Sequence, residues 1–171
     1  LYVAFLAERF GIGLLNDLVN EPRNGIDGID VTLAPFQQDF RATWAGWTAA
    51  NYAGSDVRYG YAAIGERRAT PLVTPGLPFR ADGTVDQQWG TAYVIFRESG
   101  STEIEFFGDP NGRYAVQLYV MRDGSGELQN MMLDGDSHGF TRVANADSFV
   151  VIVGRTSVQG REFELSARHF D

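Results

Sequence analysis

Few side chains in this sequence of 171 residues could carry out chemistry. The histidines number only two, His138 and His169, and there is no cysteine. A zinc-binding helix of the His-Glu-x-x-His type needs two histidines on adjacent turns, and neither histidine has a partner at that spacing. The absence of cysteine also excludes disulfides and thiolate metal sites.

Hydrolytic chemistry without a metal is also poorly supported. Asp136, Ser137 and His138 have the residue types of a serine hydrolase triad, but consecutive residues on one turn cannot align a nucleophile, a base and an orienting carboxylate. The sequence has no Gly-x-Ser-x-Gly elbow. Glu103 and Glu105 could act as paired carboxylates, but alternate carboxylates on a strand usually form its solvated face. We therefore expect no catalytic residue in this chain.

Acidic turns are the remaining candidates for a metal site. Asp134 and Asp136 flank a glycine, and Asp109 lies in another turn, so their oxygens could bind Ca²⁺. The alternative is that hairpin turns need the backbone conformations that Asp, Asn and Gly adopt. The Asp134 segment also lacks the terminal glutamate of an EF-hand loop. Calcium is therefore a possible cofactor, with these three aspartates as its candidate ligands.

Aromatic side chains offer a second kind of contact. Trp89 and Tyr93 lie close together in the sequence, and Trp44 and Trp47 lie in an earlier apolar segment. Such rings could stack on sugars or contact a protein partner, although core packing uses the same residue types. We treat these four residues as candidates for an interface or a ligand platform.

Charge excludes two classes of partner. The formal net charge is -8, all 14 basic residues are arginine, and only Arg67 and Arg68 are adjacent. No basic stripe is available to neutralise phosphates, so neither nucleic acid nor an anionic membrane surface is expected to bind. The longest apolar runs, such as 149–153, are too short to span a bilayer.

A helix over 36–52 is the element around which we expect the first third of the chain to be organised. Its apolar residues recur at helical spacing and would form one buried face: Phe36, Phe40, Trp44 and Trp47. Pro35 suits a first helical position and Gly54 suits a stop. Shorter helices are predicted at 1–10 and 13–20, and a turn-rich segment from Asn24 could begin another that reaches Leu33.

The periodicity changes to two beyond residue 88, which indicates strands. Turn signals such as Asp109-Pro110-Asn111-Gly112 separate seven segments: 92–97, 102–107, 114–122, 127–133, 139–143, 148–155 and 162–170. Short strands at this spacing are typical of an antiparallel sandwich. The sequence therefore predicts an α+β chain, with a short N-terminal helical segment (1–58), a connecting segment (59–87) and an antiparallel β-sandwich (88–171).

The first 61 residues also carry several motifs in a fixed order. These are an apolar helix over 1–10, then Gly25-Ile26-Asp27-Gly28-Ile29, Trp47-Thr48-Ala49-Ala50-Asn51-Tyr52 and Tyr59-Gly60-Tyr61. In this order they resemble the C-terminal helical part of bacterial secreted zinc metallopeptidases of the gluzincin type. A β-sandwich after the peptidase unit is also a common arrangement in that group.

The resemblance implies a role for the chain without a catalytic residue in it. In such peptidases the zinc-binding histidines and glutamate precede this region, so zinc is expected in the parent protein and upstream of Leu1. The chain begins inside a predicted helix and without Met, which we interpret as the start of a fragment. Its partner would then be the missing N-terminal catalytic part of the same extracellular or cell-surface protein.

Two functional hypotheses follow from these observations. The first is a non-catalytic C-terminal portion of a secreted zinc-dependent peptidase, in which the helices buttress the catalytic part and the sandwich stabilises it or docks substrate. The alternative is a self-contained β-sandwich that binds a carbohydrate or a peptide, with calcium assisting.

Overall fold

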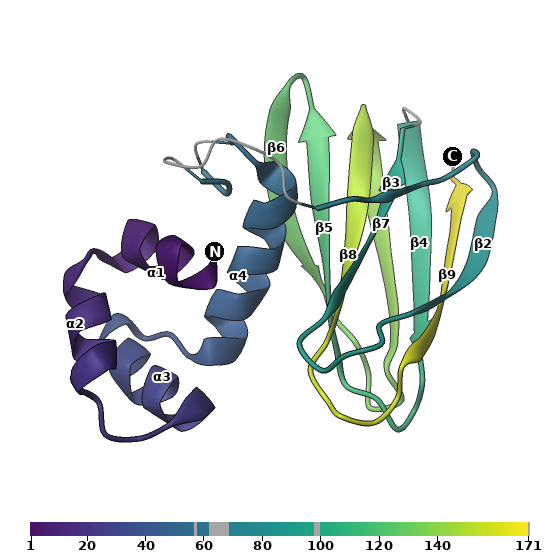
Figure 1. The fold of residues 1–171 in the computed structure, drawn as a ribbon. Helices are drawn as coiled ribbons and strands as arrows, with labels where there is room; N and C mark the ends of the chain where they lie inside the picture. Colours follow the sequence, from purple (N-terminus) through teal and green to yellow (C-terminus); the bar gives the residue numbers. More distant parts are fainter. Residues whose placement is uncertain (57, 62–68, 98–99, 171) are drawn as a thin grey trace. The chain divides into compact units, whose positions relative to one another are not determined.

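The computed structural model describes residues 1–56, 58–61, 69–97 and 100–170, in two compact units (Figure 1). The first unit, Leu1–Arg68, is helical, and the second, Ala69–Asp171, is built from β-strands. The predicted fold class, helices followed by an antiparallel sandwich, is confirmed. Within the described ranges, every helix is too short or too polar to cross a bilayer.

The helical unit contains four α-helices and one short 3₁₀ turn among its described residues. They are α1 (Tyr2–Phe10), α2 (Gly13–Asn20), α3 (Gly25–Leu33), η1 (Ala34–Phe36) and α4 (Phe40–Ala53). Their apolar stripes meet in a small core that includes Phe5, Leu6, Leu14, Leu33 and Tyr61. The three helices predicted before residue 34 are therefore present.

The longest helix begins later than the sequence predicts. Asp39 is its N-cap, because its carboxylate accepts a hydrogen bond of 2.7 Å from the backbone N–H of Ala42. Pro35 is the second residue of the 3₁₀ turn instead, and Gln37 then takes a left-handed φ of 56° that ends the turn. Phe36 consequently lies outside the helix, is 42% exposed, and contacts the ring of Phe10 at 5.1 Å.

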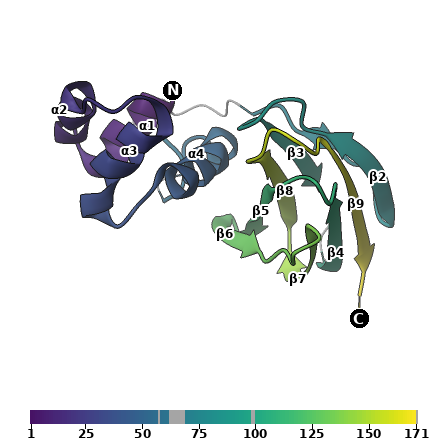
Figure 2. The ribbon, with the colours of Figure 1, turned by 90° about the horizontal axis from the view of Figure 1, so that it is seen from below.

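The second unit is a sandwich of two sheets. Its strands are β1 (Leu72–Val73), β2 (Phe79–Thr84), β3 (Thr91–Phe96), β4 (Gly100–Gly108), β5 (Tyr114–Arg122), β6 (Ser125–Met131), β7 (His138–Ala146), β8 (Ser148–Arg155) and β9 (Glu162–His169). One sheet has the order β1-β3-β8-β5-β6 and the other the order β2-β9-β4-β7. Figure 2 shows the two layers nearly end-on. All pairings are antiparallel except that of β1 with β3.

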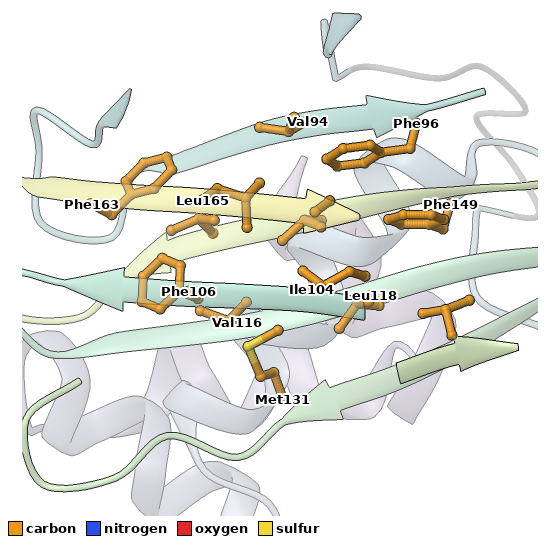
Figure 3. Close-up of a cluster of buried hydrophobic side chains, with 14 of the residues drawn as sticks. Val94, Phe96, Ile104, Phe106, Val116, Leu118, Met131, Phe149, Phe163 and Leu165 are labelled. Carbon is orange, nitrogen blue, oxygen red and sulfur yellow. The ribbon is translucent and has the colours of Figure 1, made fainter. Parts of the chain in front are cut away.

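The core of the sandwich lies between the inner faces of these sheets (Figure 3). Alternation along each strand sends every second residue inward, so Ile104 and Leu118 are fully buried. Phenylalanine rings join the layers: Phe79 of β2 packs edge-on against Phe96 of β3, with ring centroids 5.3 Å apart. Burying a side chain of this size contributes roughly 1.5–3 kcal/mol, which fixes the strands as a rigid support for their outward-facing residues.

The sandwich begins earlier than the sequence predicts. Strands β1 and β2 both fall within 59–87, which we expected to be an irregular connection. Strand β2 pairs with β9 from Phe79 opposite Ala167 to Thr84 opposite Glu162. Its alternation is short and is interrupted by Gly83, so the pattern alone did not identify a strand. The pair Arg67 and Arg68 lies outside the described residues.

Candidate functional site

The predicted calcium ligands serve their own turns. The carboxylate of Asp134 accepts hydrogen bonds of 2.9 Å from the backbone N–H groups of both Asp136 and His138. The N–H of His138 is the main reason that the pKa of Asp134 is lowered. Asp109 accepts a similar bond of 2.8 Å from the N–H of Asn111. These bonds close turns between strands, which is the structural alternative considered for these residues.

The three aspartates do not converge with other candidate metal ligands among the described residues. Among the described residues, no three His, Asp or Glu side chains come together in a way that could hold a metal ion. This holds for zinc as well as for calcium, since a zinc site uses the same residue types once cysteine is excluded. Calcium stays a prediction for Asp109, Asp134 and Asp136, without converging ligands to support it.

The four predicted platform aromatics belong to different units. Trp44 and Trp47 lie on α4, and Trp47 packs edge-on against Tyr2 at 5.6 Å in the helical core. Tyr93 lies in β3, on the side of the five-stranded sheet that points away from the sandwich core. Trp89 precedes that strand and has a left-handed φ of 62°. Trp47 is therefore a packing residue, and for the other three an interface stays a prediction.

A different surface gathers chemically active side chains, and we call it the outer face. It is the side of the β2-β9-β4-β7 sheet that points away from the core. The pairing register arranges its residues in rows across the strands. One row reads Asp82, Glu164, Phe107, His138, the next reads Arg80, Ser166, Glu105, Phe140, and a third reads Arg168, Glu103, Arg142.

The third row is an ion network in which two guanidinium groups share one carboxylate. One carboxylate oxygen of Glu103 accepts hydrogen bonds from Arg142 at 2.6 and 2.9 Å, and the other accepts one from Arg168 at 2.8 Å. Arg142, and then Arg168, lower the pKa of the Glu103 carboxyl group. The Arg142 guanidinium also lies over the rings of Phe140 and Phe170. These contacts hold the groups in place and leave Glu103 only 8% exposed.

The middle of the outer face carries an aromatic stack. The ring of Phe107 lies 4.4 Å from the His138 ring, and the two planes are tilted by only 12°. His138 Nε2 lies 3.2 Å from a carboxylate oxygen of Glu105, which fixes the imidazole. Phe107 is nevertheless 40% exposed and Phe140 is 48% exposed. Two phenylalanine rings are thus presented to solvent on a rigid sheet.

A cleft of about 840 Å³ opens beside this stack. It lies over β2, β9 and the end of β4, and its polar and aromatic lining includes Asp82, Thr84, Phe107, Asp109, Asn111, Glu162 and Glu164. The described residues that line it include four carboxylates and no basic side chain. A volume of this size is within the range of about 300–1,000 Å³ that is usual for ligand sites.

Two smaller hollows extend the concave surface. One of about 440 Å³ shares Asp109, Asn111 and Glu162 with the large cleft and continues onto the loop that follows β8. Another of about 210 Å³ lies at the end that carries the Glu103 network, and its lining includes Glu103 and Phe140. Of these three depressions, the cleft of about 840 Å³ at the acidic end has the largest volume.

Sequence reasoning identified only part of this surface. It placed Glu103 and Glu105 on one side of a strand, which the structure confirms. Phe107 ends a predicted strand and His138 lies in a predicted turn, and only the pairing of β4 with β7 brings their rings together. The available signal was the recurrence of charged and aromatic residues at alternate positions in several strands.

Comparison with known proteins gives no family. No family model and no curated protein matches the sequence. Among solved structures, the pre-peptidase C-terminal domain of a Bacillus anthracis collagenase has a TM-score of 0.46 at 12% identity, over 58% of this chain and 98% of that chain.

Two further solved structures have lower scores. A mitogen derived from Yersinia pseudotuberculosis has a TM-score of 0.39 at 17% identity, over 56% of this chain and 90% of that one. A periplasmic inhibitor of g-type lysozyme from Aeromonas hydrophila has a TM-score of 0.38 at 10% identity, over 58% and 95% of the two chains. Likeness at this level does not carry a ligand or an activity from these proteins to this chain.

Proposed function

We propose that this chain is a non-catalytic part of a secreted zinc-dependent peptidase, and that its sandwich docks a ligand on the outer face. The observation that carries the docking role is the cleft of about 840 Å³ beside the exposed ring of Phe107. The peptidase context rests on the motifs in the first 61 residues. In this proposal the zinc ligands are contributed by another part of the same protein.

The arrangement of the outer face favours docking over catalysis. Its charged groups are largely engaged with one another: Glu103 with two arginines, and Glu105 with His138. Side chains held in this way form a preorganised surface, and binding to such a surface costs little conformational entropy. Phe107 projects from the rigid sheet core and so provides an aromatic anchor with few rotamers to lose.

A titration of the chain 1–171 tests the docking role. The intact chain would be screened against immobilised peptides and glycans, followed by fluorescence titration of any ligand that binds. Phe107→Ala is expected to weaken that binding about tenfold, the equivalent of roughly 1.4 kcal/mol for a lost aromatic contact. Met132→Ala is the matched control, because Met132 is 84% exposed and lies outside the strands of the outer face.

The same screen can reject the docking role. If no peptide and no glycan binds, the outer face is only a solvated sheet surface. If a ligand binds but Trp89→Ala abolishes the interaction while Phe107→Ala has no effect, the binding site lies on the loop before β3. That second result would support the alternative of a separate carbohydrate or peptide module.

The peptidase context needs its own test. Peptide mapping of the native protein from its source would identify the residues that precede Leu1. We expect a His-Glu-x-x-His segment followed by a downstream glutamate, the usual ligands of such a zinc site. An upstream sequence without these residues would remove the peptidase part of the proposal and leave the docking part to be judged on binding alone.

A further inference from the structure

We infer that the outer face binds a cationic, arginine-bearing peptide segment, with one guanidinium group placed between Phe107 and the carboxylates of the cleft. This inference rests on the proposed docking function and names the chemistry of its ligand. Three features of the surface support it: an asymmetric charge distribution, a pair of carboxylates that face each other, and an exposed ring beside them.

The charge distribution divides the outer face into two ends. At one end Glu103 is matched by Arg142 and Arg168, so that end carries no excess of negative charge. At the other end, Asp82 and Glu162 have no ion-pair partner among the described residues. A ligand that is drawn to this surface by electrostatics will therefore be cationic and will settle at the cleft end.

The strand register places two carboxylates of the cleft opposite each other. Asp82 and Glu164 are directly opposite each other on neighbouring antiparallel strands, where side chains of like charge destabilise a sheet. Arg80 relieves this repulsion only in part, since it binds Glu164 at 2.7 Å but has a side chain that is 75% exposed. A guanidinium group from a ligand could donate hydrogen bonds to both carboxylates, because its fork of N–H donors suits carboxylate geometry.

Phe107 completes the proposed subsite. It is directly opposite Glu164 in the register of β4 and β9, and its other neighbour in the row is His138. The ring lines the cleft and is exposed, so a planar guanidinium can stack on it while donating to the carboxylates. Arginine fits this pair of contacts better than lysine, whose ammonium group is compact and cannot stack.

Peptide binding by the full chain 1–171 tests the inference. The probe is a fluorescein-labelled peptide of alternating glycine and arginine, and its control is the same peptide with citrulline, which is a neutral isostere of arginine. We expect the arginine peptide to bind at least about tenfold more tightly than the citrulline peptide, and to lose affinity as salt rises. Fluorescence anisotropy would measure both effects.

A pair of variants locates the subsite. Asp82→Asn is expected to weaken the arginine peptide several-fold without lowering the unfolding midpoint, because it also removes the repulsion with Glu164. Asp123→Asn makes the same change in net charge at the exposed β5–β6 turn, where asparagine tolerates the left-handed φ of 50°. This control should bind the arginine peptide as the unchanged chain does.

The outcomes separate this inference from the function on which it rests. If both peptides bind equally and Phe107→Ala weakens both, the docking role stands and the cationic specificity is rejected. If Asp82→Asn and Asp123→Asn weaken binding by the same factor, overall charge attracts the peptide and the subsite is rejected. If no peptide or glycan binds at all, the docking role and the inference fail together.

Discussion

The ionisation of Glu103 should be visible in the acid stability of the sandwich. Its pKa is lowered by hydrogen bonds from Arg142 and Arg168, so the folded state favours the ionised carboxylate more than the unfolded chain does. The stability it contributes is therefore complete above its ordinary pKa of about 4.3 and is lost as the pH falls through the lower folded value.

A substitution at this position gives the first prediction. Glu103→Gln should lower the urea midpoint at neutral pH, because it leaves two arginines without their carboxylate. It should also reduce the loss of stability that occurs as the pH falls below about 4.3. Glu127→Gln, which removes a more exposed carboxylate from the β5–β6 hairpin, is the control. Equal acid sensitivity in the Glu103 variant and the unchanged chain would contradict this account.

Individual residue roles were only partly predictable from the sequence. Asp134 and Asp109 were correctly associated with turns, because turns favour Asp for its local hydrogen bonds to backbone N–H groups. The two arginine partners of Glu103 could not be predicted, since Arg142 and Arg168 lie on strands far apart in the sequence. Contacts of that kind depend on strand order, which alternation within a single strand does not encode.

Elements with a long, uninterrupted pattern were predicted best. Strands β5 and β8 have the bounds that were predicted, because eight or nine residues of alternating or apolar character leave little ambiguity. Strand β2 was missed because Gly83 interrupts a pattern of only six residues. At Gly83 the structure shows a packing reason for glycine: a Cβ atom there would overlap the ring of Phe163.

The loop between β8 and β9 provides a prediction at the scale of an element. Gly160 has a left-handed φ of 68°, and a Cβ atom there would collide with the backbone of Gly112 in the loop after β4. Gly160→Ala should therefore destabilise the sandwich by roughly 1–3 kcal/mol. Gly135→Ala is a close control, because a Cβ atom at that turn meets nothing within 4 Å. Denaturant unfolding of both variants would decide, and an equal effect would refute the steric explanation.

The whole molecule consists of two units, and each has a hydrophobic core of its own. The order of helices before strands was predictable, because the apolar period changes from that of a helix to that of a strand along the chain. The boundary was not placed correctly, since β1 and β2 lie in the segment that had been assigned to a connection. When short strands have glycine and proline nearby, their sequence pattern cannot be distinguished from that of a loop.

This organisation leads to a prediction for the sandwich on its own. Residues 69–171 should fold cooperatively without the helices, because the core between the two sheets is built from residues of this unit alone. Far-UV circular dichroism should show a β spectrum, and thermal unfolding should be a single transition. A fragment of 87–171, which lacks β1 and β2, is the comparison and should be markedly less stable. Equal stability of the two fragments would show that β2 contributes nothing to the sandwich.

Strand β2 also forms one edge of the four-stranded sheet, and such an edge presents backbone N–H and C=O groups that could pair with another chain. Arg80 and Asp82 place charges along it, and Gly83 weakens it as a template for further strands. The charges beside the cleft thus keep neighbouring molecules from adding to the sheet. A protein that replaced them with apolar residues to tighten its fold would gain a route to aggregation, so solubility and ligand recognition depend on the same short strand.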